Sequence, residues 1–217
     1  MPREAKAARK ARAHAIDDRL AKQFPEATCS LDFQNPWQLL AATILAAQCT
    51  DQRVNMVTPE LFAAYPGPTE MAAADPADVE ERIRSTGFFR NKTKSLIGSA
   101  SAIVEHYHGS VPDTMEDLLS LPGVARKTAN VVLGTAFDKN EGVVVDTHVK
   151  RISGRLKLTT QTDPTKIEKD LMAILDRDRW TMFSHRLVFH GRIWCTARKP
   201  DCDGCPISDL CPSAGKV

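Results

Sequence analysis

The sequence contains no long apolar run and almost no pattern typical of β-strands. None of its apolar runs approaches the roughly 20 residues that a helix needs to span a bilayer, so we expect no membrane segment. The basic N-terminus lacks the apolar middle of a secretory signal, and we therefore expect a cytoplasmic protein. One strand-like run, Val143 to Val145, is too short to make a sheet.

The chain also lacks a strong excess of either charge. Its 29 Lys and Arg against 27 Asp and Glu give a net charge of +2, which by itself indicates no class of partner. The basic residues nevertheless gather at residues 3–12, 82–94, 148–157 and 186–199. Any one of these clusters is explained by a solvated helix face. Several of them around one site would instead follow a phosphate backbone.

Helical signals recur along the chain. Asn35-Pro36 and Asp75-Pro76 each predict an N-cap followed by a proline at the first helical position. Further helices are predicted over residues 92–106, 113–121, 165–175 and 180–190, the last ended by Gly191. With 42% hydrophobic residues in 217, the chain is expected to form an all-α fold of one large or two small domains.

Four of the six cysteines lie near the C-terminus with the spacing C-x6-C-x2-C-x5-C; they are Cys195, Cys202, Cys205 and Cys211. Without an export signal disulfides are not expected, so this spacing predicts a metal site. Tetrahedral zinc and a [4Fe–4S] cluster both fit it. Cys29 and Cys49 are isolated, and we expect them to be buried as small hydrophobic side chains.

The stretch LPGVARKTANVV, from Leu121 to Val132, predicts a tight turn that opens a helix. Gly123 allows a close backbone approach, and the free N–H groups of the helix start can bind a phosphate oxygen. Lys127 falls in the first helical turn, where the macrodipole disfavours a cation. It is therefore either a tolerated surface charge or a nucleophile. Asn130 is predicted to lie beside it on a small polar face.

Asp146 follows the apolar run that ends at Val145 and precedes Thr147. It could simply cap the next helix. A carboxylate beside an amine is also what nucleophilic catalysis on a sugar requires, because the carboxylate can accept a proton and stabilise positive charge on the sugar ring. Periodicity does not show whether Lys127 and Asp146 meet.

Five motifs in order carry a resemblance: NPWQLLAATILAAQCTD, STGFFRNKTKSL, LPGVARKTANVV, VDTHVKR and HGRIWCTARKPDCDGC. The chain resembles the endonuclease III family of helix-hairpin-helix DNA glycosylases with AP-lyase activity. The resemblance implies a six-helix domain over residues 29–139 that contains the hairpin. Residues 1–28 and 140–217 would form a second helical domain, with a DNA cleft between the two. It also implies a [4Fe–4S] cluster on the four C-terminal cysteines.

The resemblance implies roles for individual residues. Lys127 would attack the sugar and form a Schiff base that permits strand cleavage by β-elimination, with Asp146 as the essential carboxylate. Side chains that fill the space of the extruded base, the hairpin backbone and a cationic loop beside the cluster would contact DNA; these positions are Gln48, Phe88, Gly123, Ala125, His148, Arg198 and Lys199. The partner would be double-stranded DNA with an oxidised pyrimidine or an abasic site. The protein would be a monomer, nucleoid-associated when bound to DNA.

One departure and several alternatives accompany the resemblance. Ala125 stands where the family hairpin usually has a second glycine, and we expect a helical φ there. Adenine-mismatch glycosylases are disfavoured because they lack a lysine at position 127 and add a C-terminal domain. Glycosylases for mismatched thymine or pyrimidine dimers stay open. The rival from another class is a non-catalytic DNA-binding module with a structural metal.

Overall fold

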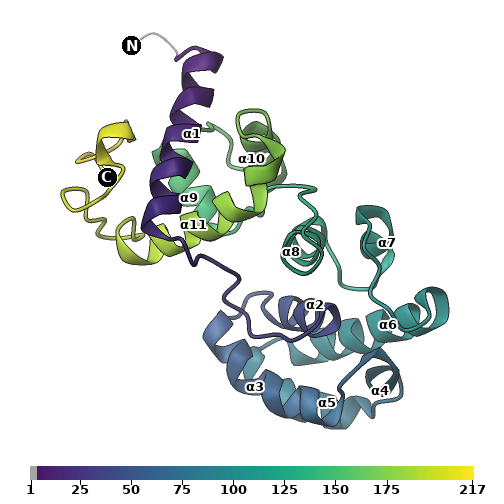
Figure 1. The fold of residues 1–217 in the computed structure, drawn as a ribbon. Helices are drawn as coiled ribbons and strands as arrows, with labels where there is room; N and C mark the ends of the chain where they lie inside the picture. The colour runs from purple at the N-terminus through teal and green to yellow at the C-terminus, as the bar shows by residue number, and fades with distance from the viewer. Residues whose placement is uncertain (1–3) are drawn as a thin grey trace. The chain divides into compact units, whose positions relative to one another are not determined.

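The computed structural model describes residues 4–217, and this part of the chain is helical without any strand, which confirms the all-α prediction. Arg3, the first residue of the N-terminal basic cluster, lies outside it. Figure 1 shows the helices. They are α1 (Lys6–Gln23), α2 (Pro36–Leu45), α3 (Asp51–Ala64), α4 (Pro68–Ala72), α5 (Pro76–Ile83), η1 (Arg84–Thr86), α6 (Phe89–Tyr107), α7 (Met115–Ser120), α8 (Arg126–Ala136), α9 (Thr147–Arg155), α10 (Pro164–Met172), η2 (Arg177–Arg179), α11 (Trp180–Ile193) and η3 (Ser208–Leu210).

The chain folds into two compact units. One is Cys29–Lys139, and the other combines the chain up to Thr28 with Asn140–Val217. Within residues 29–139, six α-helices have six or more residues, and α4 adds a short five-residue helix. No helix in residues 4–217 is both long and apolar enough to cross a membrane.

Helix α2 is the centre of the unit Cys29–Lys139. Asn35 caps it, as predicted, because the Asn35 side chain accepts a hydrogen bond from the Gln38 N–H at 3.0 Å. Leu39, Leu40 and Leu45 are fully buried on different sides of the helix. A helix that is apolar all round belongs in the middle of a core, and α2 packs against α3, α6 and α8.

In the other unit, α11 packs against both α1 and α9. The sequence predicted that Gly191 ends α11, but the residue lies inside this helix and is buried. A Cβ atom at Gly191 would lie 2.8 Å from the side chains of both His148 and Ile152. The glycine is therefore there because α9 and α11 approach closely, not because the helix stops.

Charged side chains attach α1 to the C-terminal part of the same unit. Asp17, only 1% exposed, accepts hydrogen bonds from Arg179 Nη1 at 3.0 Å and Arg186 Nη1 at 2.6 Å. Arg12 Nη1 donates to the carbonyl oxygens of Leu156 at 2.7 Å and Leu210 at 3.3 Å. The N-terminal helix therefore supports the segment that carries the last cysteines.

Candidate active site and metal centre

The hairpin consists of α7, the turn from Leu121 to Val124, and α8. The Val124 N–H donates to the Leu121 carbonyl oxygen at 3.2 Å and closes the turn. The turn lies against α6, where Ser99 Oγ donates to the Pro122 carbonyl oxygen at 2.6 Å. Gly123 has a φ of +77°, and a Cβ atom there would lie 2.5 Å from Ser95 Cβ. Both the backbone conformation and the space therefore require glycine.

We expect Gly123→Ala to destabilise the hairpin unit more than Gly109→Ala does. Gly109 has a similar φ of +78° but no atom within 4 Å of an added Cβ. It therefore reports the conformational cost alone, about 1–2 kcal/mol. Gly123→Ala adds the clash with Ser95 and should also weaken DNA binding. Urea unfolding and duplex affinity measure the two effects; equal destabilisation by both substitutions would show that Ser95 simply moves aside.

Ala125 is the N-cap of α8, with φ −95° and ψ 167°. The prediction of a helical conformation is wrong, because the residue is still extended before the helix begins. Its φ is negative, so alanine is accommodated here without the strain that a left-handed position would impose. The Ala125 side chain offers no capping hydrogen bond and the first turn of α8 holds no acidic residue. The start of α8 is thus suited to an external anion.

Lys127 is the second residue of α8 and is exposed. Within residues 4–217 its side chain has no hydrogen bond or ion pair, so the amine is available to a bound molecule. Asn130, predicted to share an open polar face with it, is only 2% exposed. That part of the prediction is wrong, because one turn further on the helix already faces the core.

Gln48 and Phe88 both have left-handed backbone conformations, with φ of 52° and 49°. Such conformations are uncommon for residues other than glycine, cost of order 1–3 kcal/mol, and cluster at functional sites. Gln48 is exposed, and Phe88 is 62% exposed although it is a large apolar residue. Both side chains are thus presented to solvent from strained turns of the same unit.

Asp146 does cap a helix. Its Oδ1 accepts a hydrogen bond from the Val149 N–H at 2.7 Å, at the start of α9. Its Oδ2 lies 3.0 Å from His148 Nδ1, so the carboxylate also orients the imidazole. Asp146 and His148 are therefore brought together in one unit, whereas Lys127 belongs to the other unit.

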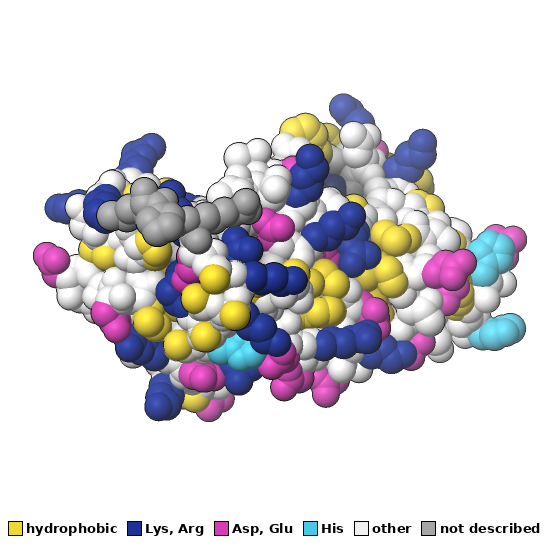
Figure 2. Space-filling model, turned by 90° about the horizontal axis from the view of Figure 1, so that it is seen from above, with side chains coloured by type: hydrophobic (Ala, Val, Ile, Leu, Met, Phe, Trp, Pro, Cys, Tyr) yellow, Lys and Arg dark blue, Asp and Glu magenta, His cyan; other side chains and the backbone are white. Residues whose placement is uncertain are grey.

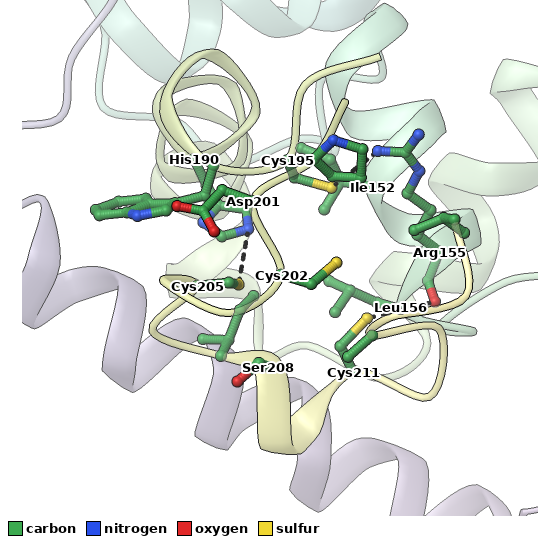
Figure 3. Close-up of a pocket in the computed structure, with 15 residues that line it drawn as sticks. Ile152, Arg155, Leu156, His190, Cys195, Asp201, Cys202, Cys205, Ser208 and Cys211 are labelled. Atoms are coloured by element: carbon green, nitrogen blue, oxygen red, sulfur yellow. Dashed lines mark hydrogen bonds between the residues drawn. The ribbon is translucent and has the colours of Figure 1, made fainter. Parts of the chain in front are cut away.

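The four C-terminal cysteines line one pocket, together with apolar side chains that include Ile152, Leu156 and Ile207 (Figure 3). Within residues 4–217 no group of three or more His, Cys, Asp or Glu side chains is placed closely enough to hold a metal ion. Four thiols around one pocket are nevertheless the donor set that a tetrahedral zinc or a [4Fe–4S] cluster takes.

The surroundings of these cysteines suit thiolates bound to a cluster. Burial raises the pKa of the Cys205 and Cys211 thiols, so a bound cation is needed to hold them ionised. Arg155 Nη1 lies 3.3 Å from Cys195 Sγ, and His190 Nε2 lies 3.8 Å from Cys205 Sγ. Burial also lowers the pKa of His190 to about 4.

The loop after Cys195 carries Arg198 and Lys199, both exposed. Arg155 fixes the loop from α9, with Nη1 donating to the Thr196 carbonyl oxygen at 2.7 Å and Nη2 to that of Ala197 at 2.9 Å. Arg155 thus fixes the backbone of the loop, while the side chains of Arg198 and Lys199 are exposed to solvent. Elsewhere, exposed Lys and Arg side chains are interspersed with acidic ones on the face drawn in Figure 2.

Two predictions about the remaining cysteines are wrong. Cys29 and Cys49 are half-buried rather than buried, and Cys49 lies in the turn beyond α2, which ends at Leu45. Sequence reasoning also missed the supporting roles of Arg155 and His190. The sequence shows only how far Arg155 and His190 lie from the cysteines along the chain, and this separation does not predict that their side chains make contact.

The comparisons decide the family. A model described as HhH-GPD superfamily base excision DNA repair protein matches residues 41–177. One described as the iron-sulfur binding domain of endonuclease III matches residues 195–211. An endonuclease III from Synechocystis sp. is 57% identical over 208 residues, covering 96% of this chain and 95% of that protein. The chain belongs to the endonuclease III family.

Solved structures agree with this assignment. A non-covalent endonuclease III–DNA complex and a trapped endonuclease III–DNA covalent intermediate each match with a TM-score of 0.89 and 41% identity, covering 94% of this chain and 96% of theirs. As a member of the endonuclease III family, the protein is a base excision repair DNA glycosylase with AP-lyase activity. It carries a [4Fe–4S] cluster, which settles the choice that cysteine spacing left open.

Proposed function

We propose that Lys127 is the nucleophile and Asp146 the essential carboxylate of an enzyme that removes oxidised pyrimidines from double-stranded DNA. The observation that supports this proposal best is the exposed, unpaired amine of Lys127, the second residue of α8, whose N-cap residue provides no capping side chain. A helix start of this kind can bind the phosphate next to a lesion and so bring the sugar to the amine.

The chemistry follows from these two groups. The neutral amine of Lys127 attacks the anomeric carbon as the bond to the base breaks, and the base leaves with the bonding electrons and takes up a proton from solvent. The Asp146 carboxylate stabilises the positive charge that develops on the sugar, then accepts a proton from the bonded amine and passes it to the ring oxygen as the ring opens to the Schiff base. The resulting Schiff base acidifies the adjacent carbon, and loss of that proton expels the 3′ phosphate by β-elimination.

Three side chains are proposed to occupy the space of the extruded nucleotide: Gln48, Phe88 and His148. The strained, exposed backbone positions of Gln48 and Phe88 support this role. His148 is held by the carboxylate of Asp146, which would couple its orientation to the catalytic group. The backbone around Gly123 and Ala125 would bind the DNA backbone without reading bases.

The domain roles are also part of the proposal. Residues 29–139 would form the hairpin domain, and residues 1–28 with 140–217 the cluster domain, which the division of the chain into two compact units supports. We propose that the cluster is held by Cys195, Cys202, Cys205 and Cys211, and that when bound it cross-links the loop without taking part in the reaction. The enzyme is expected to act as a monomer on DNA in the cytoplasm.

Arg198 and Lys199 are proposed to contact the DNA backbone. Reversing both charges, Arg198→Glu with Lys199→Glu, should weaken binding and make the dependence of log affinity on log salt shallower by about two, since each phosphate contact contributes about 0.9 to that slope. Fluorescence anisotropy across a salt series measures this. Lys166→Glu with Lys169→Glu, on the exposed face of α10, is the matched control and should leave the slope nearly unchanged.

Borohydride trapping tests the whole proposal. Reduction of the Schiff base should join the wild-type protein covalently to an abasic duplex, and mass spectrometry should find the DNA remnant on Lys127. A non-catalytic DNA-binding module would bind the duplex and yield no adduct. An adduct on another lysine would remove Lys127 from its proposed role while leaving the lyase activity intact.

A further inference from the structure

Lys92 is a charged residue inside the unit Cys29–Lys139. It is only 4% exposed, on the first turn of α6. Lysine is almost never fully buried unless its ammonium is paired, because removing the charge from water is costly. The Lys92 Nζ donates a 2.8 Å hydrogen bond to the carbonyl oxygen of Thr86. The ammonium is therefore used to hold a backbone group, not to bind solvent.

The bonded carbonyl belongs to the turn that presents Phe88. Thr86 ends η1, is 2% exposed, and its Oγ1 donates to the Ile83 carbonyl oxygen at 2.8 Å. Two residues later Phe88 has φ 49° and ψ 27°, and its carbonyl accepts from the Lys92 N–H at 3.1 Å. Lys92 thus contacts the Thr86 carbonyl through its side chain, while its backbone N–H makes the hydrogen bond that opens α6 at Phe88.

The neighbouring aromatic residue is treated differently. The Phe89 ring lies under the guanidinium groups of Arg84 at 5.3 Å and Arg90 at 5.1 Å. Among residues 4–217 Phe88 has no such contact, and it is 62% exposed. One ring is held against the protein and the other is left available, although the two are adjacent in sequence.

We propose that Lys92 is a positioning residue for lesion extrusion, whose buried ammonium fixes the Thr86 carbonyl and so presents the Phe88 side chain to the DNA. This rests on the proposed function, because it assumes that Phe88 enters the space of the extruded nucleotide. A methionine would fill the same volume without the cost of a buried charge. Lysine adds a hydrogen bond to the Thr86 carbonyl that methionine lacks, and this bond holds the strained turn in one conformation.

The test compares AP-lyase cleavage of one abasic strand as a duplex and as a single strand, under single-turnover conditions. Only the duplex requires insertion into a base stack. Lys92→Met should lower the duplex-to-single-strand rate ratio about tenfold, roughly 1.4 kcal/mol of lost extrusion. Lys92→Gln keeps an N–H donor for Thr86 and should restore most of the ratio. Lys166→Met, at an exposed lysine on α10 outside the basic clusters, should leave the ratio unchanged.

Phe88→Ala separates the two proposals. It should lower the ratio as Lys92→Met does, and the double variant should lose little more than either single variant, because both act on one step. If Phe88→Ala lowers the ratio but Lys92→Met does not, the role of Lys92 is refuted and that of Phe88 stands. An unchanged ratio in Phe88→Ala refutes both. Equal loss on the two substrates, or failure of Lys92→Met to fold, shows that Lys92 only maintains the fold.

Discussion

Lys127→Ala is expected to abolish Schiff-base trapping and to slow both base release and strand cleavage by at least about 10³-fold, since it removes the nucleophile itself. Affinity for an abasic duplex should fall by less than about tenfold. Lys127 is exposed and unpaired in residues 4–217, so its removal breaks no hydrogen bond or ion pair of the folded protein. Trapping gels and single-turnover rates measure the chemistry, and anisotropy measures the affinity.

Lys166→Ala is the matched control for this prediction. Lys166 is also an exposed lysine in a first helical turn, that of α10, and has no proposed contact with DNA. It should retain wild-type rates and trapping. If Lys127→Ala still forms the adduct at a rate within tenfold of wild type, another amine is the nucleophile, and the position of Lys127 after the hairpin is incidental.

The helix starts that the sequence predicted correctly depend on local chemistry. Asn35 and Asp75 each accept a hydrogen bond from a backbone N–H two or three residues later, and each is followed by proline. A short sequence is sufficient to specify such a cap. The four C-terminal cysteines also line one pocket, because their close spacing limits how far apart the sulfurs can lie.

The features that sequence reasoning missed depend on tertiary packing. Helix α3 was not among the predicted helices. Pro59, which disfavours a helix interior, lies inside it, yet Val54 and Leu61 are fully buried and stabilise the helix by tertiary packing. In the sequence Gly191 predicts the end of a helix, whereas in the structure it allows α9 to pack closely against α11. In the sequence Lys92 cannot be distinguished from a surface lysine, because no periodic pattern predicts its burial or its hydrogen bond to Thr86.

Helix starts are used in two ways in this protein. Asp146 and Asp163 each accept a hydrogen bond from one N–H group in the first turn of α9 and α10. Ala125 offers no such side-chain cap to α8, beside Lys127. An internal cap stabilises a helix, whereas a start without a capping side chain next to an amine is suited to a phosphate. The same backbone geometry therefore serves stability at two places and is proposed to serve binding at the third.

Asp146→Asn is expected to slow base release and cleavage by about 10² to 10⁴, the usual range for a group that accepts a proton in the reaction. The folded protein should lose little stability, because asparagine keeps an oxygen that can accept from the Val149 N–H. Asp146→Ala removes the cap as well, and should add a loss of about 1 kcal/mol in the free energy of unfolding. Single-turnover rates and urea unfolding separate the two effects.

Asp163 provides the control, because it caps α10 in the same way and has no proposed part in the chemistry. Its side chain accepts from the Lys166 N–H at 3.0 Å. Asp163→Ala should lose stability comparable to that lost by Asp146→Ala and keep wild-type rates. If Asp146→Asn also keeps wild-type rates, the carboxylate is only a helix cap, and the proton from Lys127 must go to another group. The charge of Asp146 is thus the quantity on which the proposed mechanism depends, and asparagine removes it while leaving the helix start in place.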